Sequence, residues 1–190
     1  MFKFKSIKPE DLLKVYAIKN QDQQGAIGAF SETGGARTDL VMPHETYMVG
    51  LSSLKSSEDP MPKSSGVRVI DASDTNFERI YDLHVAGGSG LEPQMLKDHD
   101  YIKDYESALD EIFASGMEEE DYEVRALRVP AIHVDAIWLH KETGANADLY
   151  IPVRTMGFFE KNMIYDKKTF FDILKEAAKD YDLSDDRLGG

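Results

Sequence analysis

At 190 residues the chain has the length of one domain, and 42% of its residues are hydrophobic, enough for a sizeable core. It contains no cysteine, which excludes disulfides, thiolate metal sites and a cysteine nucleophile. A formal net charge of −13 opposes general binding to phosphate backbones, so we expect no nucleic-acid partner. No apolar run has the length of a membrane span, and Met1–Asn20 lacks the apolar segment of a signal peptide. We therefore expect a soluble, cytoplasmic protein that does not contact membranes.

The first part of the chain predicts one helix followed by two short strands. Pro9 suits the first turn of a helix, and apolar residues recur at helical spacing over about residues 9–19. Residues 20–45 are rich in glycine and lack clear periodicity, which predicts an unusually long irregular loop. Short apolar runs then predict strands within residues 44–54 and over residues 67–70.

Two helices are predicted in the middle of the chain. A threonine and a glutamate with the spacing of a capping box precede apolar residues at helical spacing, so we expect a helix over about residues 76–86. The helix expected over residues 99–114 has a longer apolar stripe, and Asp98 or Asp100 can cap its start. This second helix is the stronger prediction because its apolar stripe covers more turns.

A β-type region follows the acidic run at residues 118–121. The segment 122–139 is rich in valine, isoleucine and leucine, and it predicts a long strand that bends at Pro130. Residues 142–146 predict a turn and residues 148–153 predict a second strand. The two strands are therefore expected to form a hairpin with a five-residue loop.

A final helix is expected over about residues 167–181, capped by Asp166, and residues 184–190 predict a frayed tail. The predicted strands follow one another in pairs and do not alternate singly with helices, which favours antiparallel pairing. We therefore expect an α+β fold: a single domain over residues 1–190, with a mainly antiparallel sheet and about four helices on one side of it.

Two residues of the long predicted strand are candidates for catalysis. His133 and Asp135 stand two residues apart, so strand alternation would place both side chains on one face. A carboxylate beside an imidazole can orient that imidazole as a general base. The alternative is a structural pair, because paired titratable groups also stabilise folds. His140 lies an odd number of residues from both, so its side chain should point to the other face of the strand and is not expected to join the pair.

Candidate binding residues come mainly from the predicted irregular segment. Arg37 can bind a carboxylate or phosphate through two parallel hydrogen bonds, and His44 and Glu45 add titratable groups to the same segment. Trp138 can line a binding groove, although a tryptophan on a buried strand more often belongs to the core. The histidines and acidic residues show no known metal-ligand spacing, so we expect neither a metal nor another cofactor.

These features favour a non-catalytic, acidic binding protein, in the class of small bacterial accessory or immunity-type proteins, with a basic protein as its partner. The alternative is a small hydrolase or transferase whose cleft combines His133 and Asp135 with Arg37, His44 and Glu45. A homodimer formed through the apolar edge of the predicted hairpin is a third interpretation. A binding protein should present a patch that is apolar at its centre and acidic at its rim, and an enzyme should present a concave pocket of convergent polar groups.

Overall fold

The computed structural model describes residues 2–26, 39–72, 77–85, 91–117, 120–142 and 147–182. Arg37, the tail over residues 184–190 and the central part of the predicted irregular loop lie outside these residues. The described elements are, in order, α1 (Pro9–Ala26), β1 (Asp39–Met48), α2 (Leu51–Ser56), β2 (Lys63–Ala72), β3 (Phe77–Val85), β4 (Leu91–Leu96), α3 (His99–Ala114), β5 (Glu123–Val129), a 3-10 turn (Pro130–Ile132), β6 (Val134–His140), β7 (Leu149–Arg154), β8 (Tyr165–Asp166) and α4 (Lys167–Ala178). Four helices and eight strands in the described residues confirm the α+β class.

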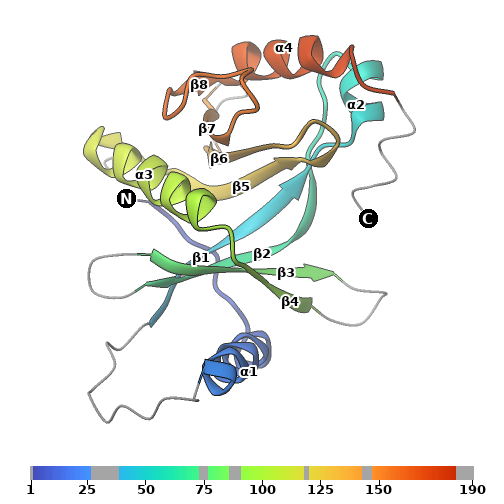
Figure 1. Ribbon diagram of the computed structural model, residues 1–190. Helices are drawn as coiled ribbons and strands as arrows, with labels where there is room; N and C mark the ends of the chain where they lie inside the picture. Colours follow the sequence, from blue (N-terminus) through green and yellow to red (C-terminus); the bar gives the residue numbers. More distant parts are fainter. Residues whose placement is uncertain are drawn as a thin grey trace.

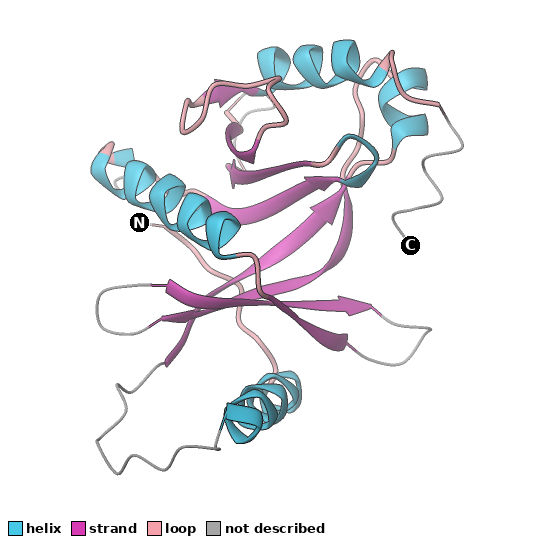
Figure 2. Cartoon of the chain, in the orientation of Figure 1, coloured by secondary structure: helices cyan, strands magenta, loops and turns pink. Residues whose placement is uncertain are grey.

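All eight described strands belong to one curved sheet with the order β4-β3-β2-β1-β5-β6-β7-β8 (Figure 2). Every described neighbour pair is antiparallel except β1 and β5, which are parallel at the centre. The chain's first residues bridge the middle of β1 and the start of β5. The Lys3 amide donates to the carbonyl of Tyr122 at 2.8 Å, and the Lys5 amide donates to the carbonyl of Pro43 at 2.8 Å. Mainly antiparallel pairing is therefore confirmed, with one parallel junction.

The helices cover both faces of the sheet, so the prediction that they lie on one side is wrong. Helix α3 packs on the concave face, where it contacts apolar residues of β2 and β3 as well as of β6 and β7, because the sheet curves around it (Figure 1). Helix α1 packs on the opposite face against β2 and β3, and α2 and α4 pack on that face near β6 and β7 (Figure 1). Successive side chains of each strand point to opposite faces of the sheet and therefore pack into separate cores.

Several predicted boundaries needed correction. The segment expected as a helix over residues 76–86 is strand β3, because its partners β2 and β4 pair with it along nearly its whole length. Residues 51–56, expected at the end of a strand, form helix α2. The expected bent strand over residues 122–139 is a hairpin of β5 and β6, and the chain reverses direction after Pro130 instead of bending there. The hairpin expected from the second half of that segment and residues 148–153 is confirmed as β6 and β7.

Both edges of the described sheet are blunted. The ammonium of Lys14 on α1 donates to the carbonyl of Leu91 on the edge strand β4 at 2.9 Å, and Pro93 of the same strand has no amide hydrogen. At the other edge, β8 covers the first residues of β7, and Pro152 follows within β7. Lysine and proline at strand edges disfavour pairing with another strand. Strand β8 pairs with only Leu149 and Tyr150 of β7, so the homodimer interpretation stays a prediction.

Candidate functional site

The two residues predicted as catalytic do not form a pair. His133 follows the 3-10 turn with a φ of +53° and an exposed side chain, whereas Asp135 is buried in β6. Asp135 accepts a hydrogen bond from Arg128, whose Nε lies 3.2 Å from its Oδ1. The prediction of a shared strand face is wrong, because His133 belongs to the connection between β5 and β6 and not to a strand.

Asp135 instead lies at the end of a polar network on the concave face, beneath α3. Arg68 on β2 donates to both carboxylate oxygens of Asp82 on β3, at 2.7 and 2.8 Å, and to the hydroxyl of Tyr101 on α3 at 2.6 Å. Arg128 approaches the same Asp82 at 3.7 Å and links it to Asp135. Burial alone would lower the pKa of Arg68, but the Asp82 carboxylate raises that pKa well above its usual value. The network is therefore charged and paired, and it joins five elements of the fold, β2, β3, α3, β5 and β6.

His44, predicted as a binding residue, belongs to the other end of this network. Its Nε2 lies 2.5 Å from the hydroxyl of Tyr105, and its Nδ1 lies 2.7 Å from the carbonyl of Met42. The Arg68 guanidinium lies 4.9 Å from the centre of the Tyr105 ring. Burial, and then the charge of Arg68, lower the pKa of His44 to about 4, so the imidazole is neutral at pH 7. With both ring nitrogens engaged, this histidine holds β1 against α3 and offers no nitrogen to a ligand.

Glu45 and Trp138, two further predicted binding residues, lie together on the opposite face of the sheet. Glu45 accepts from the Lys5 ammonium at 2.5 Å, the Tyr47 hydroxyl at 2.8 Å and the Ser64 hydroxyl at 2.9 Å. Burial raises the pKa of Glu45, but these donors, Lys5 first, outweigh it and leave that pKa below its usual value. Glu45 is therefore a carboxylate with its hydrogen-bonding capacity largely used.

An arginine between two aromatic rings connects Glu45 to Trp138. The guanidinium of Arg125 lies 5.0 Å from the centre of the Tyr47 ring and 4.7 Å from that of Trp138, and its Nη2 bonds Glu123 at 2.6 Å. Two buried donors in this stack, Arg125 Nε and Trp138 Nε1, have no hydrogen-bond partner in the described part of the chain. Trp138 is 6% exposed and belongs to the core cluster beneath α4, as the core interpretation of this residue expected.

A histidine–aspartate pair that sequence reasoning did not predict lies beside Trp138. The Nδ1 of His140 lies 2.9 Å from an Asp148 carboxylate oxygen, which also accepts from the Lys141 amide at 3.1 Å. The imidazole meets the Trp138 ring edge to face at 5.3 Å. The predicted hairpin already contained the signal for this pair. Leu139 pairs with Leu149, so the next residue on each strand, His140 and Asp148, must also be neighbours.

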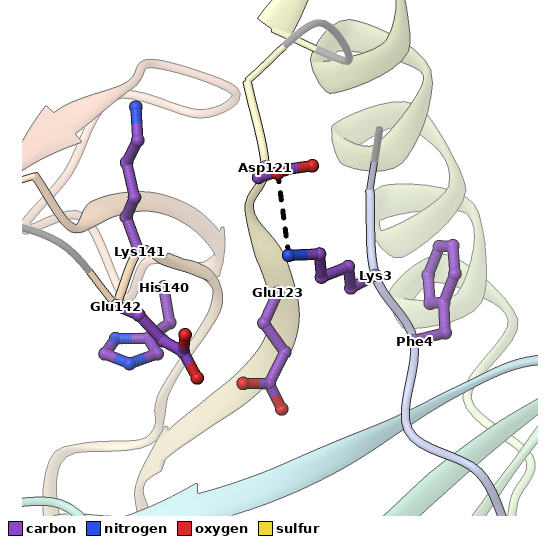
Figure 3. A pocket seen from close by; sticks show the side chains of 7 residues that line it. All are labelled: Lys3, Phe4, Asp121, Glu123, His140, Lys141 and Glu142. Atoms are coloured by element: carbon purple, nitrogen blue, oxygen red, sulfur yellow. Dashed lines mark ion pairs between the residues drawn. The ribbon is translucent and has the colours of Figure 1, made fainter.

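His140 lines a pocket of about 250 Å³ between the chain's first residues and the ends of β5 and β6. Figure 3 shows the side chains of Glu123 and Glu142 reaching toward the same space beside the imidazole, while Lys141 points away from it. Asp121 pairs with Lys3 across the pocket at 3.6 Å (Figure 3). Asp148 fixes the Nδ1 side of the imidazole, which leaves Nε2 on the side away from Asp148. The arrangement supplies an oriented imidazole among carboxylates.

A larger groove of about 620 Å³ lies on the same face of the sheet, between the segment before α1, the first turns of α1 and strands β1 and β2. Apolar side chains of three separate segments line it, and these are Ile7, Val67 and Leu91. Three ion pairs also line the groove, Lys5 with Glu45, Lys8 with Glu10 and Lys14 with Asp11, so positive and negative side chains are equal in number there. Its volume falls within the range of about 300–1,000 Å³ that is usual for small-molecule sites.

The outer side of α3 carries an acidic stripe beside an apolar loop. Asp100, Asp104 and Glu111 follow one face of the helix at intervals of four and seven residues. The loop over residues 155–164 is fixed to that face by an ion pair between Lys161 and Asp104 and by a 2.8 Å hydrogen bond from Asn162 to Ser107. Three large apolar side chains of the loop are exposed, those of Met156, Met163 and Ile164. We call these three residues and the acidic stripe the α3–loop surface.

Comparison with known protein families, with curated proteins and with solved structures found no match to this chain. Among the described residues, no group of three or more histidine, aspartate or glutamate side chains is placed to hold a metal ion. None of the described helices is long and apolar enough to cross a membrane.

Proposed function

We propose that the protein is a binding protein that engages a basic protein partner through the α3–loop surface. The observation that carries the proposal is the exposure of Met156, Met163 and Ile164 on a loop that is fixed beside the acidic stripe of α3. Exposed apolar side chains rimmed by charged groups are typical of protein interaction sites. Methionine adapts its shape to a partner surface because its side chain is unbranched and flexible.

The charges of the surface determine which partner it favours. Asp100 and Glu111 are exposed on the helix face that also carries Asp104, and the whole chain has a net charge of −13. Complementary charge accelerates association and excludes acidic competitors, and it acts less strongly at high salt. A partner with a basic rim around an apolar centre fits this surface, and the affinity should fall as salt increases.

The test begins with capture of proteins from the source cell lysate on the immobilised chain at low and moderate salt, with identification by mass spectrometry. The captured partner is then purified and titrated by calorimetry against three chains: wild type, Asp100→Lys/Glu111→Lys and Asp172→Lys/Glu176→Lys. The last variant changes the net charge equally, but on exposed positions of α4. We expect the α3 variant to weaken binding by about tenfold or more, because several rim charges are reversed, and the α4 variant to bind almost as wild type.

A second pair of variants tests the apolar centre. Met163→Ser/Ile164→Ser should weaken binding, whereas Met61→Ser, at an exposed methionine before β2, should not. An acidic partner, or a basic partner that binds all these variants with equal affinity, would contradict the proposal.

One observation favours a second candidate function, a small hydrolase or transferase with a histidine–aspartate site. His140 is oriented by Asp148 at 2.9 Å and lines a pocket, so an oriented base of the kind expected at His133 and Asp135 is present on two other residues. A panel of ester, amide and phosphoester substrates tests it with wild type, His140→Gln and Asp148→Asn. We expect any activity of this site to be lost in His140→Gln and reduced in Asp148→Asn. An activity that both variants retain belongs to another site.

A further inference from the structure

The turn over residues 155–158 holds a methionine in the left-handed region of backbone conformation. The Phe158 amide donates to the Thr155 carbonyl at 2.9 Å, which closes a four-residue turn. Its two central residues, Met156 and Gly157, have φ values of +46° and +82°, so the turn is of type I′. Glycine, asparagine and aspartate dominate the central positions of such turns, because a larger side chain crowds the backbone there. Methionine at this position therefore lowers the stability of the turn.

Packing does not account for this methionine. Three other described non-glycine residues have a positive φ, and these are Met42, His133 and Asn162. Asparagine and histidine adopt this conformation more readily than other side chains do. Met42 packs against the core beneath α3, and its carbonyl accepts from His44 at 2.7 Å. Met156 has neither property, because its side chain is 54% exposed and lies outside the core clusters of the described residues. A strained residue whose side chain does not stabilise the fold points to a function.

Both ends of the turn are fixed, so the backbone at Met156 is held in one place. Before the turn, Arg154 donates to the Asp98 carboxylate at 2.7 Å, and its guanidinium lies 4.9 Å from the centre of the Tyr101 ring. Asp98 caps α3, so Arg154 holds the turn against the end of the helix where the acidic stripe begins. After the turn, Phe159 is buried in the core beneath α4. A backbone that is ordered before binding loses little conformational entropy on association.

Strain, exposure and a fixed backbone thus occur together at Met156. We propose, on the basis that the α3–loop surface binds a basic protein, that Met156 is the anchor of this surface and inserts into an apolar pocket on that partner. Its unbranched side chain adapts to the shape of such a pocket. Met163 and Ile164 are not among the residues with a positive φ, and they surround the anchor and exclude water from it.

Replacing Met156 by asparagine separates a functional role from a structural one. Asparagine tolerates a positive φ, so Met156→Asn should raise the melting temperature by about 2–4 °C. Met163→Asn and Met61→Asn change exposed methionines that lack a positive φ, and they should leave the melting temperature nearly unchanged. Scanning calorimetry of the full chain measures the three shifts. A melting temperature of Met156→Asn at or below that of wild type would show that methionine carries no strain there, and it would overturn the proposal.

The same three variants are then titrated by calorimetry against the basic partner captured on the immobilised chain. We expect Met156→Asn to weaken binding by about tenfold or more, Met163→Asn to weaken it less, and Met61→Asn to bind as wild type. If Met156→Asn binds as tightly as wild type while Asp100→Lys/Glu111→Lys still weakens binding, Met156 is not the anchor and the proposed function stands. If neither variant weakens binding, or if no basic partner is captured, the proposed function and the anchor fail together.

Peroxide oxidation provides a measurement on the wild-type chain alone. Hydrogen peroxide converts accessible methionine side chains to the sulfoxide, and mass spectrometry of peptides gives the rate at each position. The bound partner should slow oxidation strongly at Met156 and Met163 and leave the rate at Met61 unchanged. Protection of Met163 without protection of Met156 would overturn the anchor alone, whereas equal rates at both positions in the free chain and in the complex would contradict the proposed function as well.

Discussion

His44 and Tyr105 are hydrogen-bonded across the concave face of the sheet, with 2.5 Å between the Nε2 of the imidazole and the phenolic oxygen. Their rings are nearly parallel, at 5.8 Å between centroids. The Met42 carbonyl must accept from Nδ1, so the neutral imidazole accepts the hydroxyl hydrogen of Tyr105 at Nε2. This contact joins strand β1 to helix α3 and leaves no room for a proton on Nε2.

That relationship makes the fold sensitive to acid. The pKa of His44 is about 4 in the folded chain and 6.5 in the unfolded one, so the unfolded chain takes up the proton first as the pH falls. The free energy of unfolding should therefore decrease between about pH 6.5 and pH 4, and the difference between the two pKa values corresponds to about 3 kcal/mol. Urea denaturation at a series of pH values measures it. His44→Gln, which cannot titrate, should lose much less over this range, and an equal loss in both chains would contradict the assignment.

Breaking the buried pair of Arg68 and Asp82 should lower the free energy of unfolding strongly, whereas replacing both residues with apolar ones should lower it much less. Arg68→Met leaves the buried Asp82 with the more distant Arg128 as its ion-pair partner among the described residues, and we expect a loss of about 3–5 kcal/mol in the free energy of unfolding. Arg68→Met/Asp82→Leu removes both charges and should recover much of that loss. Guanidinium denaturation of the single and double variants measures the difference. If the double variant were less stable than the single one, the ion pair itself would stabilise the fold. The loss in the single variant would then not come mainly from leaving the Asp82 carboxylate buried without its partner.

The cap of α3 should contribute through its side-chain acceptor. The Asp98 carboxylate accepts from the Tyr101 amide at 3.1 Å and from Arg154 at 2.7 Å. Asp98→Ala removes both bonds and should lower the free energy of unfolding by about 1 kcal/mol. Asp98→Asn keeps an acceptor for the amide and should lose less. Thermal denaturation of the two variants checks the order, and equal losses would assign the effect to the Arg154 ion pair alone.

The elements that the sequence predicts well are those whose signals are local. Helix α3 has its apolar stripe and its cap within one segment, and α4 begins after Asp166 as expected, with Asp166 accepting from the Thr169 amide at 2.9 Å. Strand β3 was missed because it is buried on both faces, with Ile80 toward α3 and Tyr81 toward α1. Such a strand shows no polar alternation, and its apolar residues also fit a helical spacing.

The candidate site was only partly predictable, because many of its contacts join residues that are distant in the sequence. His140 and Asp148 meet across one hairpin, so the register of that hairpin is enough to pair them. Glu45 and Trp138 share a face of the sheet, but Arg125 connects them only because β1 and β5, distant in sequence, lie side by side. The pairing of Arg68 with Asp82 requires β3 to be a strand, and this was the element predicted as a helix.

Gly66 should tolerate no side chain. Its added β-carbon would lie 1.9 Å from the Leu83 carbonyl oxygen, which belongs to the backbone of the neighbouring strand and cannot move without separating β2 from β3. We expect Gly66→Ala to lower the free energy of unfolding by about 3 kcal/mol or more. Gly116→Ala is the matched control, because its β-carbon meets no atom of the described residues within 4 Å, and a cost of about 1 kcal/mol is expected from its φ of +74°. Denaturant titration of both variants measures the contrast, and similar losses would show that the strands can separate at little cost.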